Sequence, residues 1–71
     1  MEERFLEIAA AVLRVKRENL NMDVRRDELE SWDSLAHIAL IAELEEEIGV
    51  EIPIEDVPNI KALKDFKKYL E

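Results

Sequence analysis

The chain has 71 residues, no cysteine and a formal net charge of −8, and 48% of its residues are hydrophobic. So short a chain predicts one small domain, 1–71, with little room for a deep catalytic cleft, and the lack of cysteine excludes disulfides and thiolate metal ligands. The acidic charge argues against nucleic-acid binding and favours partners with basic docking patches, while the apolar content and the scarcity of glycine and proline predict a compact helical bundle.

The first predicted helix covers residues 2–16. Its apolar residues recur at helical spacing and leave the acidic residues for solvent. Residues 17–31 lose this period and carry scattered apolar residues, Leu20, Met22, Val24 and Leu29. We expect these residues to pin a long loop to the core. Loops of this length in a compact domain tend to be functional, which points to a site nearby.

The second predicted helix begins after Asp33, whose carboxylate can cap the next turn, and ends at Glu47 or Ile48 before Gly49. At about 100° per residue it has two apolar faces. The core face comprises His37, Leu40, Ile41, Leu44 and Ile48. The second flank comprises Leu35, Ile38 and Ala42. Either the long loop or the short third helix covers this flank, or it is an apolar patch rimmed by carboxylates that docks a partner.

Two further elements complete an all-α chain. Pro53 and Pro58 leave room for one short helical turn from Ile54 to Val57. The apolar residues Ile60, Leu63, Phe66 and Leu70 then recur at spacings of three and four, with lysines between them. This pattern predicts a last amphipathic helix that runs to the C-terminus.

Ser34 would be the first residue of the second helix. There its hydroxyl is accessible and lies near backbone N–H groups without intrahelical acceptors, where a phosphate or phosphodiester is stabilised. For an isolated D-S-L triplet, ordinary capping chemistry is the stronger explanation. A serine hydrolase using Ser34 and His37 is disfavoured because no third orienting group or oxyanion hole is recognisable. A metal site is disfavoured because one histidine and scattered glutamates form no closed ligand set.

The stretch "WDSLAHIALIAELEEEIGVEIP" followed by "EDVPNIKALKDFKKYL" resembles the acyl carrier protein family, and the likeness covers nearly the whole chain. The resemblance implies an acyl-carrier-like four-helix bundle with a long first loop and a short third helix. It also implies that a phosphopantetheinyl transferase moves 4'-phosphopantetheine from coenzyme A to Ser34. The thiol of this arm would hold acyl groups as thioesters, so the protein would be a carrier and not an enzyme.

The resemblance also indicates partner contacts on the second helix, at Leu35, Ile38, Glu45 and Glu46, with Asp33 contributing to transferase recognition. The expected partners are the transferase and acyl-loading and acyl-transfer enzymes of fatty acid, lipid or specialised bacterial biosynthesis. Two alternatives stay open: an unmodified carrier-like interaction module, and an aminoacyl or peptidyl carrier. We expect a cytoplasmic monomer without a membrane span, because no apolar run approaches about 20 residues and the N-terminal segment is unlike a signal peptide.

Three features depart from the commonest fatty-acid carriers. Trp32 stands where they have a small residue, Ala36 and His37 stand where an acid often follows D-S-L, and Pro58 interrupts the short helix. The "WDSLAH" form looks like stand-alone carriers of specialised bacterial pathways. Trp32 and His37 occupy the positions of a hydrophobic staple, which is the explanation we favour. Pro58 predicts a curtailed third helix.

Overall fold

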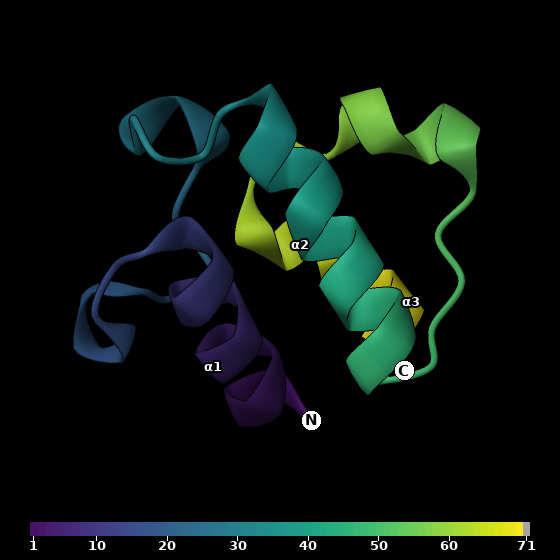
Figure 1. The fold of residues 1–71 in the computed structure, drawn as a ribbon, viewed down its shortest axis with the longest axis horizontal. Helices are drawn as coiled ribbons and strands as arrows, with labels where there is room; N and C mark the ends of the chain where they lie inside the picture. The colour runs from purple at the N-terminus through teal and green to yellow at the C-terminus, as the bar shows by residue number, and fades with distance from the viewer. Residues whose placement is uncertain (71) are drawn as a thin grey trace.

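The computed structural model describes residues 1–70, and these form an all-α bundle. The main helical segments are α1 (Glu2–Leu13), α2 (Ser34–Glu47), the 3-10 helix η3 (Ile54–Asn59), and the 3-10 helix η4 (Leu63–Phe66), which continues into α3 (Lys67–Leu70). Two further 3-10 turns, η1 (Arg17–Asn19) and η2 (Arg26–Glu28), lie in the loop before α2. Figure 1 shows α1 beside α2, with η3 near the N-terminal half of α2. The predicted four-helix architecture is confirmed.

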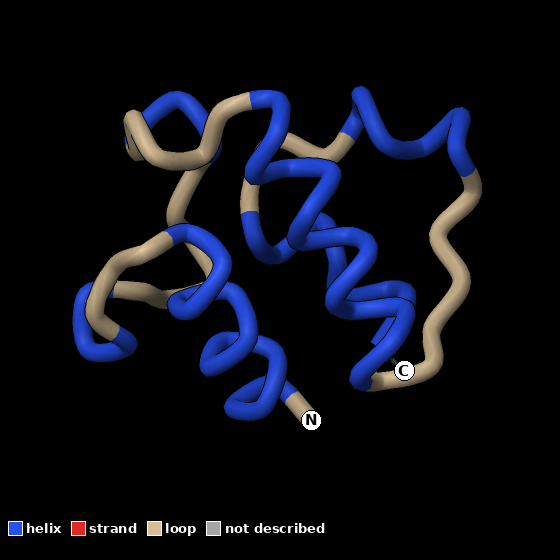
Figure 2. The backbone as a smooth tube through the Cα atoms, in the orientation of Figure 1, coloured by secondary structure: helices blue, strands red, loops and turns tan. Residues whose placement is uncertain are grey.

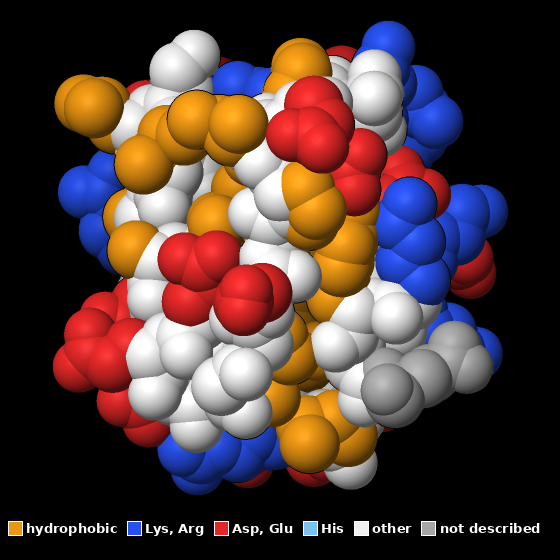
Figure 3. All heavy atoms as spheres, turned by 90° about the vertical axis from the view of Figure 1, so that its right-hand side faces the viewer, with side chains coloured by type: hydrophobic (Ala, Val, Ile, Leu, Met, Phe, Trp, Pro, Cys, Tyr) orange, Lys and Arg blue, Asp and Glu red, His pale blue; other side chains and the backbone are white. Residues whose placement is uncertain are grey.

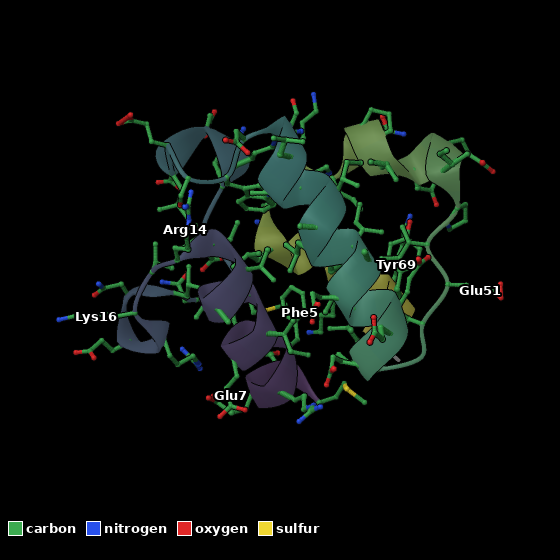
Figure 4. The ribbon with its side chains drawn as sticks, in the orientation of Figure 1. Phe5, Glu7, Arg14, Lys16, Glu51 and Tyr69 are labelled. Carbon is green, nitrogen blue, oxygen red and sulfur yellow. The ribbon has the colours of Figure 1, made fainter. Side chains whose placement is uncertain are left out.

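The core lies where α1, α2 and the last helical segment meet. Phe5 and Phe66 are fully buried, and their ring centroids lie 5.4 Å apart. Figure 4 shows the Phe5 side chain in the space between α1 and α2. The predicted core face of α2 is confirmed for four buried residues, His37, Leu40, Ile41 and Leu44, whereas Ile48 is half-buried. This packing holds α2 by one side along most of its length.

The first helix ends three residues before the predicted boundary at residue 16. Arg14 adopts a left-handed conformation with φ of 58°, and its N–H donates to the carbonyl of Ala10. The N–H of Val15 also donates to the Ala10 carbonyl, at 3.1 Å. These bonds close the helix as a left-handed cap does, although glycine usually occupies such a position. The prediction was wrong here because no glycine marks the stop.

The long loop is pinned to the core, as predicted. Leu20 is buried, and Met22, Val24 and Leu29 pack against the core as partly buried residues. The loop also pairs with the chain before η4: Arg25 and Ala62 form an isolated antiparallel bridge, and the N–H of Arg26 donates to the Lys61 carbonyl at 2.8 Å. The loop therefore has a fixed position beside the start of α2.

The last helical segment begins later than its apolar pattern predicts. Ile60 lies outside it, and Ala62 is extended, with φ of −144°. The carboxylate of Asp65 accepts from the N–H groups of Lys61 at 2.9 Å and Ala62 at 3.0 Å, which caps the helix at Leu63. The prediction of a helix from Ile60 was wrong because residues 60–62 serve the loop bridge instead.

The segment between α2 and η3 returns along α2 (Figure 2). Gly49 ends α2 with φ of 81°, a conformation that favours glycine, as predicted. The following helix is longer than the predicted Ile54 to Val57: η3 runs to Asn59 as a 3-10 helix and contains Pro58. The prediction that Pro58 curtails this helix was therefore wrong: the N–H of Ile60 donates to the Val57 carbonyl at 3.3 Å, so the 3-10 turns continue past the proline. The hydroxyl of Tyr69 donates to the Asp56 carboxylate at 2.6 Å, which ties α3 to η3.

Candidate functional site

Ser34 is exposed at the first position of α2. Asp33 precedes it with an extended backbone, and its Oδ1 accepts from the Ala36 N–H at 2.9 Å. The N–H of His37 donates to the Asp33 carbonyl, also at 2.9 Å. The predicted N-cap is confirmed. The hydroxyl of Ser34 thus projects from a fixed helix start, next to the backbone N–H groups of the first turn and the positive end of the helix dipole.

Trp32 and His37 form the predicted staple. Their side chains pack against each other and are also joined by a hydrogen bond. Both side chains are 2% exposed, and their ring centroids lie 5.9 Å apart. Trp32 Nε1–H donates to His37 Nδ1 at 2.9 Å, so Nδ1 must lack a proton. His37 Nε2 then carries the proton and donates to the Val57 carbonyl at 2.9 Å. This chain of hydrogen bonds fixes the start of α2 to η3.

Burial lowers the pKa of His37 below its ordinary value of 6.5; the hydrogen bond to the Val57 carbonyl opposes this shift, and repulsion from Arg26 adds to it. Protonation would also place two N–H donors, from Trp32 and His37, face to face. Between the folded and unfolded pKa values the unfolded chain binds more protons, so stability falls as the pH drops from about 6.5 through the folded pKa.

We therefore expect an NMR titration of the single imidazole to give a midpoint below 6.5 in the folded protein. The same resonance in urea-unfolded protein provides the reference. Urea unfolding should show a loss of stability over the window between the two midpoints. A folded midpoint at or above the unfolded one would contradict the hydrogen-bond arrangement that the structure shows.

The second flank of α2 is exposed. The exposed fraction is 83% for Leu35 and 57% for Ile38, and Ala42 is also exposed. Of the two interpretations of this flank, coverage by the loop or by the third helix is therefore wrong. The sequence reasoning missed Ile54, which is 84% exposed at the start of η3. Its position directly after Pro53, at the head of a short turn, was the available signal. Figure 3 shows apolar side chains exposed among carboxylates on the side that carries η3.

The predicted acidic contacts lie at the other end of α2 from Ser34. Glu46 is 12 residues along the helix, which corresponds to about 18 Å. Glu45 and Glu46 are both exposed. The carboxylate of Glu45 also accepts from the Ile52 N–H at 3.2 Å and so helps to hold the returning segment. Because Glu45 has this structural contact, a substitution at Glu46 is the better test of docking.

Arg26 is a neighbour of Ser34 that the sequence reasoning did not single out. Its Nη2 donates to Ser34 Oγ over a long contact of 3.4 Å. The two residues are eight positions apart, and the loop bridge to residues 61 and 62 brings them together. A pair of arginines in a chain of net charge −8 was the only signal in the sequence.

The side chains do not favour the other chemistries considered for this site. Both ring nitrogens of His37 are engaged by Trp32 and Val57, so the imidazole is not placed to activate Ser34. Within residues 1–70, no group of three or more histidine, aspartate or glutamate side chains is arranged to hold a metal ion. Over the same residues, no helix has the length and apolarity needed to cross a bilayer.

Comparison with known proteins shows which protein family this chain resembles. Residues 3–70 match the family model described as "Phosphopantetheine attachment site". The chain is 31% identical over 71 residues to an acyl carrier protein of Rickettsia bellii (strain OSU 85-389), covering all of this chain and 88% of the relative. It is 38% identical over 66 residues to an acyl carrier protein homolog of Ureaplasma parvum serovar 3, covering 86% of each chain.

The chain therefore carries the domain to which 4'-phosphopantetheine is attached in carrier proteins. It belongs to the acyl carrier protein family, as the resemblance indicated.

Proposed function

We propose that Ser34 is the residue that carries 4'-phosphopantetheine and that the protein presents acyl groups on this arm to separate enzymes. Its thiol supplies the thioester chemistry, which the chain has no cysteine to provide. The chain itself would hold and present the cargo without catalysing its transfer. We extend the proposal to a monomer in the cytoplasm, a compartment with which a chain without cysteine is compatible.

The exposure of the Ser34 hydroxyl at a capped helix start is the observation that carries this proposal. A phosphodiester on Ser34 Oγ would lie near the N–H groups of the first turn, where a negative charge is stabilised by about 0.3–1 kcal/mol. The Arg26 guanidinium faces the same oxygen. The residues around Ser34 therefore fit the charge and the linkage of the group.

Incubation of the apo protein with coenzyme A and a promiscuous phosphopantetheinyl transferase tests the proposal. Intact-mass spectrometry should show one phosphopantetheine added, and peptide mapping should place it on Ser34. An unchanged mass with an active transferase would reject the proposal. It would leave an unmodified carrier-like interaction module, and protein purified from its native host should then also have the mass of the bare chain.

We also propose that partner enzymes dock on the exposed flank of α2, through Leu35, Ile38 and the carboxylates beside them. Exposed apolar side chains of this size favour contact with a complementary surface. Carboxylates steer partners with basic patches and determine how strongly binding depends on salt. Asp33 would contribute to transferase recognition, although its carboxylate also caps α2.

Charge reversal at Glu46 should weaken binding to the transferase. We expect Glu46→Lys to reduce its affinity roughly three- to tenfold at low salt, with the difference shrinking as salt screens the charges. Glu18 is an exposed glutamate of η1, and Glu18→Lys therefore provides a control with the same change in charge. Calorimetry at two salt concentrations measures the effect, and circular dichroism checks helicity. Equal affinities for the two variants would rule out Glu46 as part of the docking face.

A further inference from the structure

A groove lies between α1 and α2, outside the docking face proposed above. Its volume is about 520 Å³, and its apolar lining comes from Ile8, Ala11 and Val12 of α1 and Ala39 of α2. Ile8 and Val12 are partly buried against the core, whereas both alanines are exposed. Because alanine side chains are short, the two helices leave an apolar hollow between them that is open to solvent.

The charged lining of the groove is mostly acidic. Glu7 of α1 and Glu43 of α2 are exposed, and within residues 1–70 no lysine or arginine lies at ion-pair distance from either carboxylate. At one end of the groove, Arg4 Nη2 pairs with Glu47 Oε1 at 2.9 Å and ties the two helices together. The groove therefore has two uncompensated carboxylates, one from each helix, and attracts cations.

The groove and the docking face occupy neighbouring sides of α2. At about 100° per residue, Ala39 and Glu43 lie next to the flank of Leu35 and Ile38 but on the side that is turned towards α1. Glu43 is nine residues from Ser34, which corresponds to about 14 Å along the helix. A helix held in the groove therefore leaves Ser34 and the flank open.

We propose that this groove is a second docking site, which binds an amphipathic helix of a partner protein with an apolar face and lysines or arginines along both edges of that face. Such helices lie in apolar grooves with their anchors three and four residues apart. From Arg4 to Val12 the groove follows α1 for about 12 Å, the length of about two helical turns. The apolar lining receives the anchors, and Glu7 and Glu43 pair with the cations.

The partner is a different protein and not a second copy of this chain. In a second copy, the lysine-rich segment formed by η4 and α3 has Leu63 and Phe66 buried, so it does not offer an apolar face to the groove. This docking site does not require the modification of Ser34. A partner held in the groove keeps the protein close by, while Ser34 and the flank of α2 stay free for another enzyme.

The unmodified protein and a synthetic peptide test this site. The peptide has about 15 residues, with leucines on one helical face and lysines on the other, and it stands in for the partner helix. In an NMR titration, the largest amide shifts should fall on Ala11, Ala39 and their neighbours. Glu43→Lys should weaken binding roughly three- to tenfold at low salt. Ala39→Gln should also weaken it, because the longer side chain fills the hollow that the leucines need.

Two controls match these variants. Glu51→Lys makes the same change in charge at an exposed position, and Figure 4 shows Glu51 and α1 on opposite sides of α2. Ala42→Gln makes the same substitution on the exposed flank, so it weakens binding only if the peptide lies there instead. Circular dichroism checks that each variant keeps its helicity.

Three results would overturn the groove as a docking site. The first is the absence of binding at low salt. The second is an equal loss of affinity in Glu43→Lys and Glu51→Lys, which would mean that opposite charges attract the peptide to the whole surface. The third is a larger loss in Ala42→Gln than in Ala39→Gln, which would place the peptide on the flank of α2. None of these results bears on the modification of Ser34.

Discussion

Ser34→Ala is expected to abolish the addition of phosphopantetheine completely. The chain contains only two serines and no threonine, so Ser31 is the one other aliphatic hydroxyl that could accept the group. Ser31 is partly buried and lies before the cap, whereas Ser34 is exposed at the first position of α2. Ser31→Ala should therefore be modified at nearly the rate of the original protein, as measured by intact mass over time.

Both serine variants should remain folded, because substitutions of exposed or partly exposed surface residues usually change stability by about 0.5 kcal/mol or less. Circular dichroism before the reaction checks this. Modification of Ser34→Ala, or its loss in Ser31→Ala, would show that the attachment point has been placed on the wrong residue.

His37→Ala is expected to lower the free energy of unfolding by about 3–5 kcal/mol. The variant removes a buried ring and leaves the Trp32 indole N–H and the Val57 carbonyl without their partner. A chain of 71 residues has a total stability of about 4–10 kcal/mol, so the variant should lose roughly a third or more of it. Urea unfolding followed by circular dichroism measures the loss.

Ile38→Ala provides the comparison for this variant. It truncates the next residue of the same helix, but the Ile38 side chain is 57% exposed, so we expect a change of about 0.5 kcal/mol or less. Similar losses in the two variants would mean that a general weakening of α2 explains the effect. The bonds of His37 to Trp32 and to η3 would then not be its cause.

The sequence predicts α2 and its start well because each boundary has a local chemical cause. Asp33 caps the helix with its own carboxylate, and Gly49 ends it in a conformation that few other residues adopt. The end of α1 could not be predicted in this way, since Arg14 adopts a left-handed conformation without the usual glycine. The start of η4 depends on the bridge between Ala62 and Arg25, which joins residues far apart in the chain.

At the candidate site, too, features with a local cause are predictable, and features that depend on distant parts of the chain are not. The accessible position of Ser34 follows from the local pattern of a cap and a helix. The exposure of Leu35 and Ile38 does not, because it depends on where η3 packs, and η3 is fixed at His37 on the opposite side of the helix start. The contact of Arg26 with Ser34 likewise requires the loop to be folded back over eight residues. Local chemistry predicts the attachment point, and tertiary packing determines its surroundings.

Trp32, described above as part of the staple, also gives the protein a built-in fluorophore. It is the only tryptophan in the chain, it is hydrogen-bonded to the only histidine, and it stands two residues before Ser34. Indole emission responds to nearby imidazole groups and to the polarity around the ring. The intensity and wavelength of this single tryptophan therefore respond to changes around the helix start, so changes at the attachment point can be followed without a chemical label.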